Sequence, residues 1–490
     1  MALLAWGHLA VTPAAQERMK GGVSPAFRTG FPCFVRHSSF TDQKGEVLTA
    51  MPTSHSRRIV LVCVLLALIV FASVFAAACG TETEETSTTV APETTTTAAP
   101  ESSTTTMATG DPTTTTAAQA EPLVFGMVLV GPYNDGGWSQ AHYEAGLYLE
   151  EKLPGAKMVY VDKANSADRP GTTVDQLAEE LLKQGAKMIF FTSDDMKDGA
   201  IAFAKAHPEI PVEFSSGDSS WTDGKDYQNL PNLSCIMGKM EYGKMMAGVA
   251  AALTTKTGKI GYLGPLINDE TRRLAASAYL GARYAWTEYL GKNPADLKFT
   301  VNWIGFWFNI PGVTSDPTQV ADNFYNQGYD VVISGIDTTE ALAEAAKLTQ
   351  SGKSVFAIPY DFKGALEQAP DVALGVPYFN WGPEYLKAAT MVIEGKWAGF
   401  FSWVGPDWAD LNNADTSMIG FEKGKGLSAE ASAKVDEFVQ ALAGGLNLWT
   451  GPLNLQDGTA YLKDGEVATD QQVWYLPQLL EGMEGQSVSE

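Results

Sequence analysis

Short apolar runs alternate with helical patterns from Leu123 to Phe379, and this alternation limits the possible folds more than any other feature of the sequence. Apolar runs bounded by glycine are typical of strands buried in a parallel sheet. The expected strands cover residues 123–131, 158–162, 188–193, 211–216, 259–265, 299–305, 330–335, 354–360 and 374–379, the last of the chain. The expected helices cover residues 139–152, 171–185, 196–207, 240–256, 271–289, 317–328 and 338–351. This order predicts doubly wound α/β sheets, and about 370 residues are too many for one such sheet, so we expect two lobes.

Polar and aromatic side chains recur at the carboxyl ends of these strands, where ligands of open α/β sheets bind. The residues concerned are Asp135, Trp138, Ser139, Ser193, Asp194, Trp307, Asp361 and Asn380. Aromatic rings can stack on a flat ligand, while carboxyl, hydroxyl and amide groups pair with its edge. Each aromatic residue taken singly also fits core packing, and the glycine turn at 136–137 also fits a capped helix start. The repetition at strand ends favours a binding site for a flat, neutral ligand.

Signals for catalysis and for metal binding are sparse in this region. Histidine occurs only at positions 142 and 207, too few for a histidine-rich metal site, and we expect neither a metal nor a cofactor. Cys235 is expected to be a small buried apolar residue. The region has no glycine-rich phosphate loop and no Gly-x-Ser-x-Gly nucleophile elbow. Carboxylates are plentiful, so a glycosidase-like pair stays open.

The charge balance excludes one broad class of partner. Lys and Arg number 34 against 57 Asp and Glu, and the formal net charge is -23. A protein that binds nucleic acid needs a basic surface to neutralise phosphates, so we expect no nucleic-acid partner. The 4 cysteines among 490 residues also exclude a scaffold built from disulfides.

The N-terminal quarter of the chain differs in composition from the rest. Residues 1–50 show no helical or strand period and end before Met51; we interpret them as an extension upstream of the true start, with a cytoplasmic tail as the alternative. Residues 51–79 combine a basic start, an uncharged apolar stretch and small residues, as a secretory signal does. Residues 80–121 are rich in Thr, Ala, Pro and Glu, a composition that predicts a disordered tether.

The signal segment ends in the run Ala76-Ala77-Ala78-Cys79-Gly80, which resembles a bacterial lipobox. The resemblance implies cleavage just before Cys79 and attachment of a diacylglycerol to that cysteine, although alanine stands at 76 where leucine is commoner. An uncleaved transmembrane helix is the alternative, because about 20 apolar residues can span a bilayer. Both interpretations place the rest of the chain outside the cytoplasm, since the basic residues stay inside.

Several segments together carry a resemblance to a known family. They read VGPYNDGGWSQAHYEAG (130–146), QLAEELLKQGAKMIFFTS (176–193), KIGYLGP (259–265), RLAASAYLGAR (273–283), VNWIGFWFN (301–309), NQGYDVVISG (326–335) and NWGPEY (380–385), with the tail 451–485. In these motifs the chain resembles the BMP (basic membrane lipoprotein) family of ABC-transporter substrate-binding proteins, in its purine-nucleoside-receptor-like group. The resemblance implies that residues 122–490 adopt a type I periplasmic-binding-protein fold, with two α/β lobes, a hinge and a cleft between the lobes.

The same resemblance implies roles for the strand-end residues. The residues implied as ligand contacts are Asp135, Trp138, Ser139, Ser193, Asp194, Trp307, Asp361 and Asn380. Trp138 and Trp307 would hold a purine base or nucleoside between their rings, and Asp361 corresponds to an aspartate that contacts ribose. Asn380 stands where nucleoside-binding members have a lysine, and this departure favours a free purine base.

The resemblance further implies a binding protein and not an enzyme. Such a protein is a monomer, held on the outer face of the cell membrane, that closes around its ligand and delivers it to an ABC permease and its ATPase. Two other classes stay open: a binding module that presents its ligand to a signalling receptor, and an extracellular hydrolase built on the same scaffold.

Overall fold

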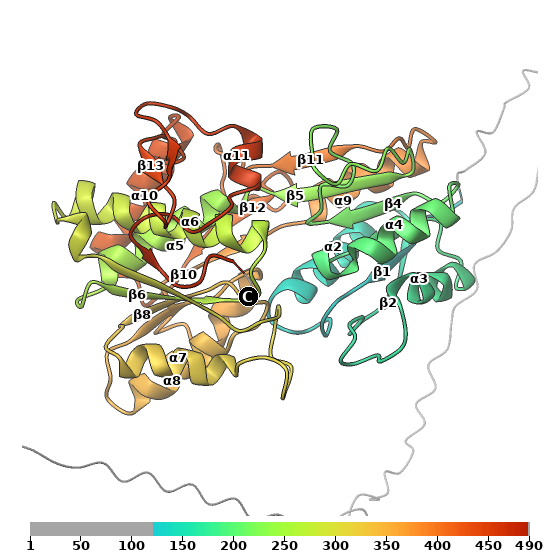
Figure 1. Cartoon of the computed structure of the whole chain (residues 1–490). Helices are drawn as coiled ribbons and strands as arrows, with labels where there is room; N and C mark the ends of the chain where they lie inside the picture. Colours follow the sequence, from blue (N-terminus) through green and yellow to red (C-terminus); the bar gives the residue numbers. More distant parts are fainter. Residues whose placement is uncertain (1–120, 489–490) are drawn as a thin grey trace, which may run out of the picture. The chain divides into compact units, whose positions relative to one another are not determined.

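Two parallel sheets organise residues 121–488, the part of the chain that the computed structural model describes (Figure 1). The expectations for residues 1–50, for the signal segment 51–79 with Cys79, and for nearly all of the tether 80–121 lie outside the described residues.

The first lobe is built on a six-stranded parallel sheet in the order β11-β5-β4-β3-β1-β2. Its strands are β1 (Val124–Val128), β2 (Lys157–Val161), β3 (Ile189–Phe191), β4 (Val212–Ser215), β5 (Leu233–Gly238) and β11 (Phe401–Val404). Its helices are α2 (Trp138–Lys152), α3 (Val174–Lys183), η1 (Asp194–Met196), α4 (Lys197–Ala206) and α9 (Gly382–Ile393). Strands β1, β3, β4 and β5 are almost wholly buried because helices cover both faces of the sheet, as in other parallel sheets.

The second lobe is built on a five-stranded parallel sheet in the order β15-β7-β6-β8-β9. Its strands are β6 (Lys259–Gly264), β7 (Lys298–Trp303), β8 (Val331–Ser334), β9 (Phe356–Ile358) and β15 (Met483–Glu484). Its helices are α5 (Met240–Thr254), α6 (Asp269–Tyr284), the π-turn η2 (Ala285–Tyr289), η3 (Pro294–Asp296), α7 (Pro317–Asn326), α8 (Glu340–Gln350), η4 (Lys363–Gln368) and α10 (Ala429–Ala443). Three smaller pieces complete the lobe: the antiparallel pair β10 (Gly375–Phe379) and β12 (Ile419–Lys423), the pair β13 (Leu453–Asn454) and β14 (Ala460–Leu462), and the short helix α11 (Asp470–Trp474).

The described chain passes between the lobes three times. Strand β5 of the first sheet leads directly into α5, which packs on α6 and β8 of the second lobe. Strand β10 leads back into α9, and β11 leads forward into β12, so the connections at 238–240, 379–382 and 404–419 lie between the lobes. This arrangement confirms the expected α/β class with two lobes joined by crossing segments.

Most of the expected strands and helices are present within a few residues of their expected bounds. The expectation that 374–379 is the last strand is wrong, because β11, β12 and three shorter strands follow it. Strand β5 was also not expected. The expected helix 271–289 begins two residues earlier, at Asp269, and its last turn is the π-turn η2. Among the residues described, no helix is both long and apolar enough to cross a membrane.

Candidate functional site

A narrow cavity lies where the carboxyl ends of the two sheets face each other. The first lobe contributes Trp138, Ser193, Asp194 and Ser216 to its walls. The second lobe contributes Tyr262, Glu270, Thr271, Leu274, Trp307, Gly335, Asp337 and Tyr360. Its aromatic walls with a few polar groups are typical of small-molecule pockets.

Two indole rings, Trp138 and Trp307, line this cavity from opposite lobes. Trp138 is held in place: its Nε1 donates a 2.5 Å hydrogen bond to the carbonyl oxygen of Thr192, and its ring packs edge-on against Trp381. Trp307 has neither kind of support, because its buried Nε1 has no hydrogen-bond partner and its ring no aromatic neighbour among residues 121–488. The face of the Trp307 ring can therefore stack on a ligand, and its N–H group can donate a hydrogen bond to it.

Three carboxyl groups of the cavity wall have raised pKa values. Burial raises the pKa of Glu270 to about 7, and it raises the pKa of Asp194 as well. Burial raises the pKa of Asp337 well above its usual value, and the nearby charge of Asp361 adds to this effect. Asp194 accepts a hydrogen bond from Asn268 Nδ2 at 3.2 Å. A wall of such groups pairs best with a ligand that offers N–H or O–H donors.

Asp135 and Ser139 shape the turn that carries Trp138. The Asp135 carboxylate accepts hydrogen bonds from the backbone N–H groups of Gly137, Ser139 and Gln140 at 2.9–3.0 Å. Ser139 Oγ accepts one from the backbone N–H of Gly131 at 2.9 Å. Burial nevertheless raises the pKa of Asp135 to about 6. Neither side chain is among the residues that line the cavity, so the structure places them outside its wall, in the turn before α2.

Asp361 lies directly behind the cavity wall, next to Tyr360. It is fully buried with a φ of 70°, and neither carboxyl oxygen has a hydrogen-bond partner within the described range. Lys244 of α5 faces the same corner: its Nζ lies 3.0 Å from the centre of the Tyr360 ring and donates to the Ser334 carbonyl oxygen at 2.8 Å. Burial raises the pKa of Asp361 and lowers the pKa of Lys244, while the attraction between the two charges opposes both shifts.

Asn380 lies apart from the cavity. Its Nδ2 donates hydrogen bonds to the carbonyl oxygens of Ala414 and Ser417 at 2.9 and 2.8 Å, which fixes the connection between β11 and β12. It lines a separate hollow beside Tyr378 and Asn412. Of the expected contacts, the structure therefore brings Trp138, Ser193, Asp194 and Trp307 together at the cavity.

Sequence reasoning missed several wall residues. Asp337 follows the expected strand 330–335 by two residues, and Tyr360 is the last residue of the expected strand 354–360, so the strand-end rule points to both. Glu270 gave no such signal. It stands six residues beyond the end of β6, in the first turn of α6, where an acid is ordinary because it favours the positive end of the helix dipole.

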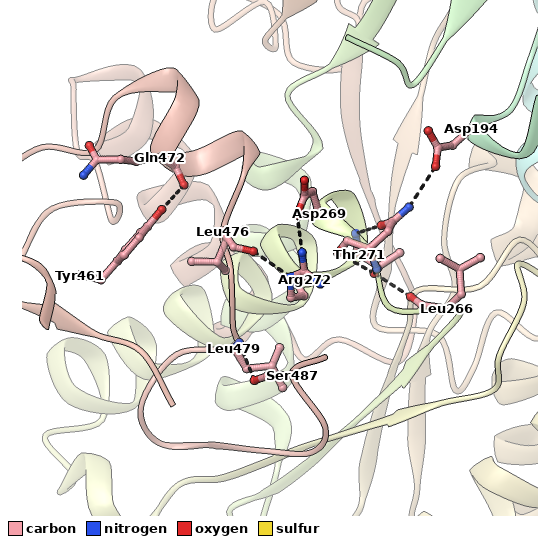
Figure 2. Close-up of polar contacts among 11 residues, drawn as sticks. Asp194, Leu266, Asp269, Thr271, Arg272, Tyr461, Gln472, Leu476, Leu479 and Ser487 are labelled. Carbon is pink, nitrogen blue, oxygen red and sulfur yellow. Dashed lines mark hydrogen bonds and ion pairs between the residues drawn. The ribbon is translucent and has the colours of Figure 1, made fainter. Parts of the chain in front are cut away.

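Glu270 lies in the first turn of α6, and several contacts fix the start of this helix. Figure 2 shows those of Thr271 and Arg272. Asn268 and Thr271 form a reciprocal capping box, and Thr271 Oγ1 also donates to the Leu266 carbonyl oxygen at 2.7 Å. Arg272 donates from Nε to the Leu476 carbonyl oxygen at 2.8 Å and forms an ion pair with Asp269. The helix start is therefore tied to the C-terminal segment of the second lobe, and through Asn268 to Asp194 of the first.

The two lobes meet closely beside the cavity. A Cβ atom built on Gly137 would overlap the carbonyl oxygen of Asp337, and one built on Gly136 would contact the side chain of Gln368. Gly136 also has a φ of 77°, which favours glycine. The glycine pair thus allows the turn after β1 to approach the loop after β8.

The wall carries no recognised catalytic or metal-binding arrangement. Over residues 121–488 no group of three or more His, Cys, Asp or Glu side chains could hold a metal ion. Cys235 is a fully buried free cysteine in β5, as expected, and burial raises the pKa of its thiol to about 12.

Comparisons with known proteins agree with this geometry. Residues 123–407 match the family described as "ABC transporter substrate-binding protein PnrA-like". A purine-binding protein of Brucella abortus is 30% identical over 356 residues, which are 72% of this chain and 91% of that protein. An ABC transporter nucleoside-binding protein of Lactococcus lactis is 28% identical over 34% of this chain and 43% of its own length. A solute-binding protein of an ABC transporter system from Aeropyrum pernix has a similar fold, with a TM-score of 0.53 and 14% identity over 68% of this chain and 93% of its own.

Proposed function

The chain belongs to the family of PnrA-like ABC transporter substrate-binding proteins, and from this premise we propose that it captures a purine base or nucleoside outside the cytoplasm for an ABC importer. The observation that carries the proposal is that Trp138 and Trp307, from opposite lobes, line one cavity. Two indoles in one cavity suit a flat aromatic ring, and each base–aromatic stack contributes about 1–3 kcal/mol. The relatives named for purine and nucleoside binding support the same ligand class.

The cavity favours a free base over a nucleoside. Asn380, which stands where nucleoside-binding members have a lysine, holds a loop outside the cavity. Asp361, the ribose-contacting position, lies behind Tyr360 and faces Lys244. The side of the cavity where family members place ribose thus has neither expected contact at its surface.

The mechanism requires binding and closure but no chemical step. The ligand enters between the lobes and stacks on Trp138, which the first lobe holds rigidly. The second lobe then brings Trp307 and the carboxyl groups to the other face and edge of the ring. The closed protein docks on a membrane permease, and the permease's ATPase drives import. The carboxyl groups of the wall act in this scheme as hydrogen-bonding groups for the ligand's donors.

The proposal includes a lipid anchor and an extracytoplasmic location. Cys79 would carry the lipid, residues 80–121 would tether the body to the membrane, and the protein would act as a monomer. These features rest on the lipobox-like run around Cys79 and on the composition of the tether.

Binding of purines to the purified chain tests the proposal, with Trp307→Ala and Trp397→Ala as a matched pair. Trp397 lies outside the cavity, packs edge-on against Phe400 and donates from Nε1 to the Asn232 carbonyl oxygen. By titration calorimetry with adenine, guanine, hypoxanthine and their nucleosides, Trp307→Ala should lose about 5- to 150-fold in affinity, the equivalent of one stack. Trp397→Ala should bind as the unaltered protein does. Failure of the unaltered protein to bind any purine, or equal losses in the two variants, would contradict the proposal.

A further inference from the structure

Glu270 and Asp337 are the carboxyl groups of the cavity wall whose oxygens accept no hydrogen bond in the described part of the chain, and Glu270 is the one carried by a capped helix start. The side chain is only 8% exposed and borders the cavity, and its carboxyl oxygens accept no hydrogen bond within the described part of the chain. By contrast, Asp135 is used by three backbone N–H groups and Asp194 by Asn268. A buried carboxyl group without a hydrogen-bond partner has a large desolvation cost. The presence of such a group in the cavity wall therefore indicates that a ligand supplies the missing partner.

The neighbours of Glu270 do not occupy its oxygens. Arg273, one turn along the same helix, pairs with Glu241 at 2.6 Å and lies over the Trp474 ring at 4.3 Å. The other charged groups around Glu270 are Asp194 of η1, Lys244 of α5, and Asp337 and Asp361 of the strand-end loops. Lys244 donates instead to the Ser334 carbonyl oxygen. The hydrogen-bonding capacity of Glu270 is thus left for something in the cavity.

The chemistry of a carboxyl group matches the edge of a purine ring. As a carboxylate it offers two neighbouring acceptors, and as a carboxylic acid it offers one donor beside one acceptor. Guanine presents two neighbouring donors, N1–H and the 2-amino group. Adenine and hypoxanthine present a donor beside an acceptor, at N1 and the 6-substituent. A single glutamic acid that can take either protonation state can therefore pair with both kinds of edge.

We infer that Glu270 is a specificity-determining residue of the cavity, and that its two oxygens pair with two neighbouring edge positions of the purine held between Trp138 and Trp307. This inference rests on the proposed function. It assigns the recognition of the ring edge to the second lobe, at the start of α6, a position that the sequence did not indicate. The raised pKa of Glu270, about 7, supports it because both protonation states are then accessible near neutral pH.

The test uses the full chain in detergent and compares Glu270→Gln and Glu270→Ala, with Glu288→Gln as the control on the exposed side of η2. Glutamine keeps one donor beside one acceptor, so Glu270→Gln should bind adenine and hypoxanthine within about threefold of the unaltered protein. The same variant should lose about 10- to 100-fold for guanine, because an amide has one acceptor where N1–H and the 2-amino group together need two. Glu270→Ala should lose at least about tenfold for each purine that the unaltered protein binds. Glu288→Gln should change nothing.

The outcomes separate this inference from the proposed function. If the unaltered protein binds no purine, the proposed function fails. If it binds purines but both Glu270 variants bind them equally well, or if Glu270→Gln weakens all three purines by the same factor, the assignment of Glu270 is overturned while the proposed function stands. Thermal unfolding without ligand at a temperature no lower than that of the unaltered protein shows that any loss of affinity in a variant arises in the cavity.

Discussion

At the scale of single residues, the cavity contains carboxyl groups kept in an unfavourable environment. Glu270, Asp194 and Asp337 all have raised pKa values because burial disfavours their charged forms. A folded protein retains such groups at a cost in stability. In the proposed function, donors of the ligand offset that cost at the moment of binding.

Glu270 should therefore make the ligand-free protein less stable as the pH rises. Its pKa is raised from 4.5 to about 7 on folding, so the stability it contributes is complete below pH 4.5 and is lost as the pH passes through about 7. The shift corresponds to at most about 3 kcal/mol. Glu270→Gln should raise the free energy of unfolding in denaturant by up to that amount at about pH 8, and leave it unchanged at about pH 4. A gain of equal size at both pH values would show that Glu270 is not desolvated as described.

The site residues show where sequence reasoning succeeds and where it stops. Trp138, Ser193, Asp194 and Trp307 were predictable because strand ends of a parallel sheet point to one place. Glu270 was not predictable, because its position depends on how the second lobe faces the first. Asn380 follows a strand as well, yet its amide is used by loop carbonyl groups that come from much later in the chain.

At the scale of elements, the turn that begins α2 is fitted to the loop after β8. Gly137 leaves no space for a side chain against the Asp337 carbonyl oxygen. The backbone of Asp337 in turn donates to the Trp307 carbonyl oxygen at 3.0 Å. The position of the Trp307 ring therefore depends on how closely the two lobes approach each other at Gly137 and Asp337.

Gly137→Ala should weaken ligand binding without weakening the fold. The added methyl group would hold the turn away from Asp337, so Trp307 could not reach its place and affinity should fall at least about tenfold. Gly405→Ala is a suitable control, because a Cβ there meets only Tyr242 at an ordinary 3.8 Å. Titration calorimetry gives the affinities, and thermal unfolding without ligand should be similar for both variants. Full affinity in Gly137→Ala would contradict this role of the contact between Gly137 and Asp337.

The elements that sequence reasoning missed share a physical cause. Strand β11 is short and half-buried, and it extends the edge of the first sheet after the chain has returned from the second lobe. Strand β12 pairs antiparallel with β10 across about 40 residues of separation. Local periodicity indicates βαβ units well, but it carries no signal for strands whose partners come from another part of the chain.

At the scale of the whole described body, the C-terminal segment adds a further connection between the lobes. Tyr475, which follows α11, stacks on Trp221 of the first lobe with ring planes 7° apart, and its hydroxyl group donates to Asp218. Gln471 donates to the Asp223 carbonyl oxygen at 2.6 Å. The lobes are thus joined by the three crossing segments and by this side-chain contact.

The attachment of the chain to the membrane can be tested with two cysteine variants. Cys79→Ala should abolish incorporation of labelled palmitate and move the protein from the membrane fraction to the soluble extracytoplasmic fraction, because the acceptor thiol is lost. Cys235→Ala should change neither property, since Cys235 is buried in β5. Retention of Cys79→Ala in the membrane fraction would favour the uncleaved helix over a lipid anchor.

The unpaired groups around the cavity have a consequence for transport. Trp307 Nε1 and the Tyr360 hydroxyl group, both of residues in the cavity wall, find no partner among residues 121–488, and each buried, unpaired group costs about 1–3 kcal/mol. Closure without a ligand would therefore leave these groups buried and unpaired. The ligand-free protein would favour an open form, with the two lobes separated. In the importer proposed above, the permease would rarely bind a closed protein that holds no ligand. The binding protein itself would thus limit ATP hydrolysis that is not coupled to import.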